Sequence, residues 1–246
     1  MKREYRVVIA GASSGIGRAL AEAFASRGVK VGIAARNTDR LEALKEKYPD
    51  NILYETIDIN NQKAPERLHD LIKRLGGMDL YIHAAGIGYK NPHLDTDTEV
   101  RTVETNTVGF ARMVSAAYRY FRDRRCGGQI AAISSVAGTK GIGTMAAYSA
   151  SKRFDSTYLT ALEQLNRRQN AGVYFTDIRP GWVRTPLLVD GEKYMMEMSL
   201  EEVVPQILEA IIHRRRVAVI DFRWRLLVAL WRLIPNAIWT RLPVSF

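Results

Sequence analysis

A tyrosine and a lysine four positions apart, Tyr148 and Lys152, offer the clearest chemistry in this sequence of 246 residues. In a helix, side chains at i and i+4 lie on one face, so the phenol and the ammonium point into the same space. A phenol with its ordinary pKa of about 10 is a poor base, and bringing it to neutrality takes about 4 kcal/mol. One ammonium at about 4–5 Å supplies roughly 3–4 kcal/mol at an effective dielectric constant near 20. The pair therefore predicts a general acid/base, in which Tyr148 moves a proton.

A glycine-rich run at residues 11–17 is the second segment that could do chemistry. It follows an apolar run, 7–10, and precedes a segment with helical apolar periodicity, 16–27. The glycines allow close approach of a pyrophosphate, and the N-terminus of the following helix offers unpaired N–H groups. The spacing is GxxxGxG, and no Lys-Ser or Lys-Thr follows, which excludes a P-loop. We expect a dinucleotide phosphate site lined by Gly11, Ser13, Ser14, Gly15, Ile16 and Gly17.

The residue after the second apolar run, 29–35, bears on which dinucleotide binds. A cofactor with a free ribose 2′-OH usually meets an Asp or Glu there, whereas this chain has Arg36. A guanidinium fork matches the oxygens of a 2′-phosphate, so we predict NADP(H), with NAD(H) the less favoured cofactor. Arg18 would add positive charge close by. Asp58, after the third apolar run, is expected near the adenine.

The elements that must position these residues alternate regularly along the chain. We expect strands at residues 7–10, 29–35, 52–57, 80–82, 129–133, 173–178 and 217–220. Helical periodicity covers residues 16–27, 39–48, 65–75, 98–122, 147–168 and 200–213. Such alternation requires crossovers and gives a parallel sheet covered on both faces. The predicted fold is α/β, a doubly wound parallel sheet of about seven strands in a Rossmann-type three-layer sandwich.

Composition excludes several classes of protein. No run of about 18 apolar residues occurs, so no transmembrane helix is expected. The apolar run near the N-terminus ends at Gly11 and is too short for a signal peptide. Cys126 is the only cysteine, which excludes a disulfide framework and fits a reducing compartment. The four histidines are scattered without HExxH spacing, so no metal site is expected. We predict a cytoplasmic protein.

Taken together, the glycine-rich run and the YxxxK pair resemble the motifs of the short-chain dehydrogenase/reductase family, over the chain up to about residue 220. In that family a serine lies 13 positions before the tyrosine, which is Ser135 here. The resemblance implies that Ser135 hydrogen-bonds the substrate carbonyl oxygen and that Asn106 holds a water linking the lysine to solvent. It implies a catalytic set of Asn106, Ser135, Tyr148 and Lys152, of which Tyr148 and Lys152 also contact the cofactor. It further implies a homo-oligomer, a dimer or a tetramer.

The segment 180–185 is similar to the PGxVxT segment of the family. There the backbone near Val183 and the hydroxyl of Thr185 would hold the carboxamide and orient the nicotinamide. The resemblance thus places four further residues at the cofactor: Pro180, Gly181, Val183 and Thr185.

One segment departs from the family. After the fourth apolar run the family often has Asn-Asn-Ala-Gly, whereas residues 83–86 read His-Ala-Ala-Gly. Ala84 cannot brace the sheet with its side chain, but Ala85 and Gly86 still permit close approach of the cofactor. His83 is expected to be a packed or hydrogen-bonded histidine rather than a catalyst.

The C-terminal segment is set apart by its charge and its aromatic content. Residues 213–246 hold seven arginines and one acid, and so carry +6 of the formal net charge of +10. Trp224, Trp231 and Trp239 lie there among Leu, Val and Ile. Arginine beside tryptophan on an apolar helix suits a bilayer interface. No groove-reading motif accompanies the arginines, so nucleic-acid binding is not expected.

Three uses of this segment stay open: packing over the chain's own domain and substrate pocket, packing on a neighbouring subunit, and peripheral contact with a membrane. We predict a single Rossmann domain over residues 1–221. Residues 222–246 would form a basic aromatic helical tail packed on that domain or extending from it.

The predicted activity is NADP(H)-dependent interconversion of a ketone or aldehyde and an alcohol by hydride transfer. Apolar residues in the expected pocket and lid favour a hydrophobic or lipid-like small molecule, such as a 3-oxoacyl or 3-ketosphinganine type ketone. They are Met145, Trp182, Leu187, Leu188, Tyr194, Met195, Met196 and Met198. The alternatives are a non-catalytic dinucleotide-binding regulator and a membrane-associated scaffold.

Overall fold

Parallel strands in one sheet form the centre of the computed structural model, which describes residues 4–188 and 194–244. Within those ranges the strands are β1 (Arg6–Ala10), β2 (Lys30–Ala35), β3 (Ile52–Thr56), β4 (Leu80–His83), β5 (Gly128–Ile133), β6 (Val173–Arg179) and β7 (Val217–Val219). Their order is β3-β2-β1-β4-β5-β6-β7. The order reverses between β1 and β4, the switch point where open α/β sheets bind ligands. The predicted seven-stranded, doubly wound fold is confirmed.

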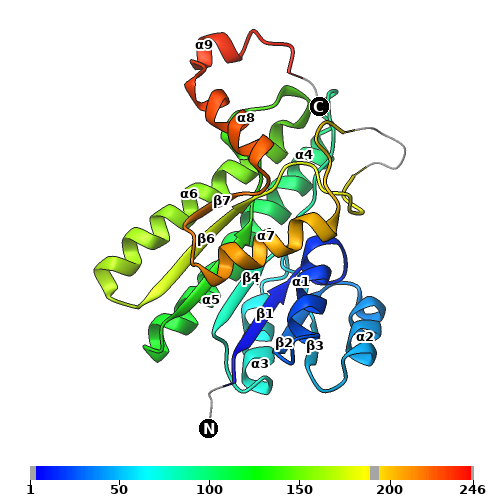
Figure 1. Cartoon of the computed structure of the whole chain (residues 1–246), viewed down its shortest axis with the longest axis vertical. Helices are drawn as coiled ribbons and strands as arrows, with labels where there is room; N and C mark the ends of the chain where they lie inside the picture. The colour runs from blue at the N-terminus through cyan, green and yellow to red at the C-terminus, as the bar shows by residue number, and fades with distance from the viewer. Residues whose placement is uncertain (1–3, 189–193, 245–246) are drawn as a thin grey trace.

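Helices cover both faces of the sheet (Figure 1). One face carries α1 (Gly15–Ala25), α2 (Thr38–Lys47) and α7 (Leu200–Ile212), and the other carries α3 (Ala64–Arg74), α5 (Phe110–Arg124) and α6 (Ala146–Gln169). Strand β1 shows why: Val7 and Ile9 pack into the core of the first face, whereas Val8 and Ala10 pack into the core of the second. Alternate side chains of a strand point to opposite faces, so a continuous apolar run suits a sheet buried on both sides.

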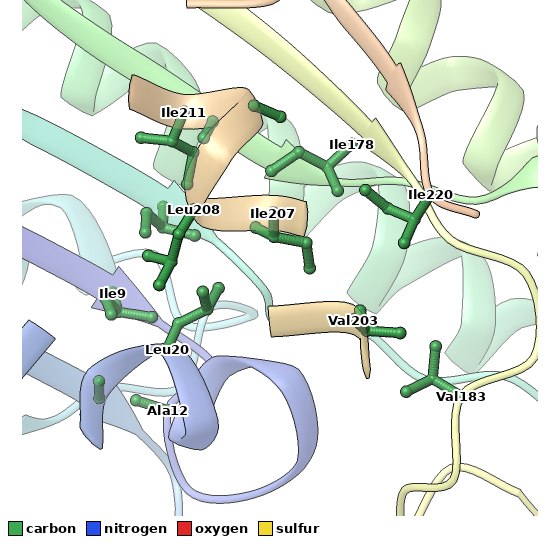
Figure 2. Packing of buried hydrophobic residues seen from close by; sticks show 14 of the residues in the cluster. Ile9, Ala12, Leu20, Ile178, Val183, Val203, Ile207, Leu208, Ile211 and Ile220 are labelled. Carbon is green, nitrogen blue, oxygen red and sulfur yellow. The ribbon is translucent and has the colours of Figure 1, made fainter. Parts of the chain in front are cut away.

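The core of the first face fixes the glycine-rich run. Figure 2 shows Leu20 of α1 and Ile9 of β1 pointing toward Leu208 and Ile207 of α7. Ala12, inside the glycine-rich run, is fully buried in the same cluster. Each such aliphatic side chain contributes about 1.5–3 kcal/mol when fully buried. The packing between α1 and α7 therefore holds the loop at the carboxyl end of β1.

The helix predicted over residues 98–122 is present, but it is not α-helical throughout. The chain forms α4 (Thr96–Val103), then a π-helical segment η1 (Glu104–Gly109), and then α5. Gly109 packs so closely on Ile59 that a Cβ there would lie 2.8 Å from its Cγ1. The side chain of Asn106 hydrogen-bonds the backbone of Ile87, in the loop after β4. These long-range contacts favour an extra residue in the turn, a feature common at functional sites.

The C-terminal tail folds onto its own domain as α8 (Phe222–Leu233) and α9 (Asn236–Trp239). Trp224, Trp231 and Trp239 are buried in the core of the first face. The indole of Trp239 donates to the carbonyl of Gly141 at 2.7 Å, and Lys140 donates to the carbonyl of Ile234 at 2.8 Å. Figure 1 shows these helices at the end of the molecule far from the N-terminus. No helix within the described ranges is both long enough and apolar enough to cross a membrane.

Candidate active site

A cavity of about 970 Å³ opens at the carboxyl ends of the central strands. Its size is at the upper end of what small-ligand and cofactor sites need. Every residue predicted to bind the cofactor lines this one cavity, and so does Ser135. They are Gly11, Ser13, Ser14, Gly15, Ile16, Gly17, Arg36, Asp58, Ala85, Gly86, Tyr148, Lys152, Pro180, Gly181, Val183 and Thr185.

The glycine-rich loop has a shape that a side chain would block. At Gly11 φ is +88°, and a Cβ there would lie 2.3 Å from the backbone nitrogen of Ala85. At Gly17 a Cβ would lie 2.2 Å from the carbonyl oxygen of Gly11. Ser14 begins α1 in extended backbone with no capping bond from its side chain, and no acid occupies the first turn. The first N–H groups of α1 therefore face the cavity edge as an anion site that fits a pyrophosphate.

Two arginines lie where β2 meets α2. Arg36, at the end of β2, and Arg40, in the first turn of α2, both line the cavity. Between them Asn37 caps α2, its side chain accepting from the backbone N–H of Arg40 at 2.9 Å. Arg40 was not predicted from the sequence, although an arginine in the first turn of the helix that follows Arg36 is a usable signal for a phosphate site. Arg18 does not line the cavity and instead pairs with Glu22 at 3.1 Å.

The tyrosine and lysine lie on one face of α6, as predicted. The Nζ atom of Lys152 lies 5.9 Å from the centre of the Tyr148 ring. It donates to the carbonyl of Ile133 at 3.1 Å and pairs with Asp155 at 3.1 Å. Burial works against the charged amine, but the carboxylate of Asp155 and the Tyr148 phenol outweigh it and raise the pKa of Lys152. The ammonium is thus kept charged beside the phenol at neutral pH.

Ser135 follows β5 and faces the same space. Its Oγ accepts from the backbone N–H of Ala137 at 3.1 Å and donates to the carbonyl of Pro180 at 3.4 Å. The second bond is long, so the hydroxyl can turn its proton toward a substrate oxygen at small cost. This geometry suits the predicted role of hydrogen-bond donor to a carbonyl.

Asn106 lies behind the cavity wall rather than on it. Its side chain accepts from the N–H of Ile87 at 2.8 Å and donates to the carbonyl of Ile87 at 2.7 Å and to Ser151 at 3.1 Å. Gly86 lies between it and the lysine: a Cβ there would be 3.3 Å from Asn106 Oδ1 and 3.5 Å from Lys152 Nζ. Asn106 therefore clamps the loop after β4, and its role in holding a water stays a prediction.

His83 is a packed residue, as expected. It is buried, and its Nδ1 hydrogen-bonds the hydroxyl of Tyr81 at 3.0 Å. Burial, followed by the nearby charge of Lys152, lowers the pKa of His83 to about 3. The ring is therefore neutral at physiological pH and carries no proton for catalysis. Within residues 4–188 and 194–244, no cluster of His, Cys, Asp and Glu could hold a metal ion.

The end of the cavity away from Arg36 has an apolar wall. Of the predicted pocket residues, Met145, Trp182, Leu187, Leu188 and Tyr194 line it. The other three do not: Met195 is exposed, Met196 packs on the core, and Met198 is buried in it. Trp224 and Trp231, from the inner face of α8, complete the wall. Trp224 presses on Gly181, where a Cβ would lie 2.1 Å from the indole, so the tail also supports the segment expected at the nicotinamide.

Residues 5–194 match the sequence model of the short chain dehydrogenase family. The chain belongs to this family. The predicted family is confirmed, and with it an oxidoreductase of that type. An uncharacterized oxidoreductase of Myxococcus xanthus is 33% identical over 238 residues, which cover 93% of this chain and 92% of the relative.

Solved structures share the fold. A short-chain dehydrogenase of Burkholderia cenocepacia, solved in complex with NADP, is 21% identical with a TM-score of 0.83, and the match covers 99% of both chains. A 3-ketoacyl-(acyl-carrier-protein) reductase of Brucella melitensis, solved with NADH, is 22% identical with a TM-score of 0.77. That match covers 87% of this chain and 95% of the reductase. At these identities the likeness concerns the fold alone.

Proposed function

We propose that this protein reversibly reduces a ketone or aldehyde to an alcohol with NADP(H). The observation that carries the proposal is that one cavity joins the anion-binding loop, Arg36 and Arg40 to Ser135, Tyr148 and Lys152. A nicotinamide dinucleotide bound there supplies a hydride to the carbonyl carbon, or accepts one from the alcohol. The Burkholderia relative that shares the fold was solved with NADP, and the two arginines suit the extra phosphate of that form.

The chain's own residues deal with the oxygen and its proton. Ser135 donates a hydrogen bond to the carbonyl oxygen, where negative charge develops. Tyr148 gives its proton to that oxygen during reduction and takes it back during oxidation. The buried ammonium of Lys152 stabilises the tyrosinate left behind. Asn106 holds the loop after β4 in place through its two hydrogen bonds to the backbone of Ile87.

The substrate we propose is hydrophobic or lipid-like, with a 3-oxoacyl or 3-ketosphinganine type ketone as the model. The apolar wall formed by Trp182, Trp224 and Trp231 supports this, because it offers a substrate chain contact and no charge. The Brucella protein of similar fold is a 3-ketoacyl-(acyl-carrier-protein) reductase, which agrees with a substrate of the 3-oxoacyl type.

Two tail tryptophans provide a matched test of this pocket. Both Trp231 and Trp239 are buried, but only Trp231 lines the cavity. Trp231→Ala is expected to raise KM for long-chain ketones about tenfold, the equivalent of about 1.4 kcal/mol of lost contact, and to leave KM for short ketones unchanged. Trp239→Ala should destabilise the fold without changing KM for long-chain ketones relative to KM for short ones. The measurement is oxidation of NADPH and of NADH across carbonyl compounds of increasing chain length.

The same screen separates the proposal from its alternatives. A preference of the wild-type protein for small polar ketones would contradict the lipid-like substrate. Tight NADPH binding with no turnover of any carbonyl compound would favour a non-catalytic dinucleotide-binding regulator.

We also propose that the outer face of the tail contacts an anionic membrane surface. Four apolar side chains of α8 are exposed, by 52–79%: Phe222, Leu226, Leu230 and Leu233. Arg225, Arg232 and Arg241 are exposed around them, and no acid occurs in residues 222–246. An apolar face with arginines and no acid is complementary to anionic lipid, where each arginine contributes about 1 kcal/mol near the surface.

Vesicle flotation tests the membrane contact. The full chain should float with vesicles rich in phosphatidylserine and lose binding as salt rises. The double variant Leu226→Gln, Leu230→Gln should bind about 10–100-fold more weakly, because two leucines no longer insert. The control variant Leu165→Gln, Val217→Gln removes two side chains that are each 40% exposed outside the tail, and it should bind like the parent. Equal binding by both double variants, or no binding by the parent, would refute this contact.

The homo-oligomer and the cytoplasmic location stay predictions. Exposed valines at 100, 103 and 108, on α4 and η1, offer an apolar surface to a second copy of the chain.

A further inference from the structure

A buried carboxylate lies directly behind the catalytic lysine. Asp155 is 1% exposed, and its Oδ2 lies 3.1 Å from the Nζ of Lys152. Positions 148, 152 and 155 are spaced by four and three residues, so the phenol, the ammonium and the carboxylate share one face of α6. The buried face of the helix continues with Leu159 and Leu162. Buried serines also lie along the helix, at Ser149, Ser151 and Ser156, but Asp155 is the only acid among the buried residues of α6.

Stability alone explains this acid poorly. A buried ion pair is often no more stabilising than apolar side chains of similar size, because both charges lose their hydration. Only one carboxylate oxygen is used: Oδ1 of Asp155 is buried and has no hydrogen-bond partner among the described residues. Lys152 also has a second acceptor, the carbonyl of Ile133 at 3.1 Å, which orients it without help from an acid. What Asp155 adds is a negative charge next to the ammonium that faces Tyr148.

We propose that Asp155 is a positioning residue that shares the charge of Lys152 and thereby sets the pH at which Tyr148 exchanges its proton. A lone ammonium favours the tyrosinate, and a carboxylate on its far side weakens that effect. With Asp155 ionised, Tyr148 keeps its proton to higher pH. With Asp155 neutral, Lys152 still faces the Tyr148 phenol, the Asp177 carboxylate and the Ile133 carbonyl, which favour its charged form. Its charge then acts on the phenol unshared, and the proton leaves at lower pH.

The charged neighbours of this pair are few. From α6 there are Lys152 and Tyr148, and from β6 there is Asp177, which is close enough to act on both members of the pair. Asp177 is itself bound by Arg179 at 2.6 and 2.8 Å and by the hydroxyl of Ser134. From β4 comes His83, which is neutral at physiological pH. Burial, opposed by the charge of Lys152, raises the pKa of Asp155 to about 6, so the carboxylate is ionised at neutral pH.

The test is a spectroscopic titration of Tyr148 in the protein with NADP⁺ bound. The near-ultraviolet absorbance of tyrosinate is followed against pH, and each protein is compared with the same protein carrying Tyr148→Phe, so that the other tyrosines cancel. Asp155→Asn is expected to lower the midpoint of the tyrosinate titration by about one pH unit. This is the effect of removing one charge at about 10 Å when the effective dielectric constant is near 20. Glu163→Gln removes an equal charge from the same helix, where it binds Arg167 and Arg216 at the surface, and should leave the midpoint unchanged.

An unchanged or raised midpoint in a folded Asp155→Asn protein would overturn the inference. If that variant does not fold, Asp155→Ser leaves room for water beside the ammonium and is read in the same way. The inference rests on the proposed function only through the role of Tyr148, and the titration needs no substrate. A substrate screen without turnover would therefore count against the function and leave this measurement valid.

Discussion

Replacing Tyr148 with phenylalanine is expected to lower kcat for carbonyl reduction by about 10²–10⁴-fold, the usual contribution of a positioned acid/base group. The ring of Tyr148 stays in place in this variant, and the buried Lys152 keeps its partners Ile133 and Asp155. Only the hydroxyl that gives the proton is lost. Affinity for NADPH should change by less than about twofold, because the glycine-rich loop and Arg36 are untouched.

Stopped-flow oxidation of NADPH and fluorescence titration of its binding measure the two quantities separately. The control is Tyr89→Phe, which removes the phenol hydroxyl of a second tyrosine that lines the cavity and should retain turnover. Unimpaired kcat in the Tyr148→Phe protein would remove Tyr148 from the mechanism. Loss of turnover together with loss of NADPH binding would instead indicate that the substitution disturbs the cavity.

Replacing Arg36 with alanine is expected to weaken NADPH binding by about 10–100-fold, because a charge-assisted hydrogen bond to a phosphate contributes about 1.5–3 kcal/mol. NADH lacks the 2′-phosphate, so its affinity should stay the same and the preference between the two cofactors should narrow. Arg40→Ala should weaken NADPH binding in the same sense, since it lines the same part of the cavity.

Isothermal titration with NADPH and NADH measures the effect for each variant. Arg18→Ala is the matched control, because Arg18 is ion-paired with Glu22 outside the cavity and should leave both affinities unchanged. If Arg36→Ala lowers the affinities for NADPH and NADH equally, this arginine stabilises the loop and does not bind the 2′-phosphate.

The arrangement of the sheet could be predicted because its causes are local. Apolar runs of strand length alternate with helical periodicity, and right-handed crossovers leave few other ways to bury them. The glycine-rich run could be interpreted for the same reason, since close approach at Gly11 and Gly17 needs residues without side chains. The turn of π-helix at Asn106 could not be predicted, because it depends on Ile87 and Ile59, which come from distant segments of the chain.

Some residues of the candidate site could not be predicted from the sequence, because their positions depend on tertiary contacts. Asp155 looks like an exposed acid of a long helix until the fold buries it beside Lys152. Trp224 and Trp231 were recognised as part of a tail, but helical periodicity alone does not say which wall their shared face completes. Met195, Met196 and Met198 were predicted to line the pocket but do not. The apolar type of a side chain does not by itself decide between a pocket wall, the core and the surface.

The most direct measurement of the proposed chemistry is the fate of the transferred hydrogen. Long-chain ketones would be incubated with the protein and with NADPH that carries deuterium at the transferable position of its nicotinamide ring. The alcohol product should carry the deuterium on its carbinol carbon, and the Tyr148→Phe protein should form almost none of it. NADPH that binds in the cavity without delivering deuterium to any ketone, or equal product from both proteins, would contradict the account.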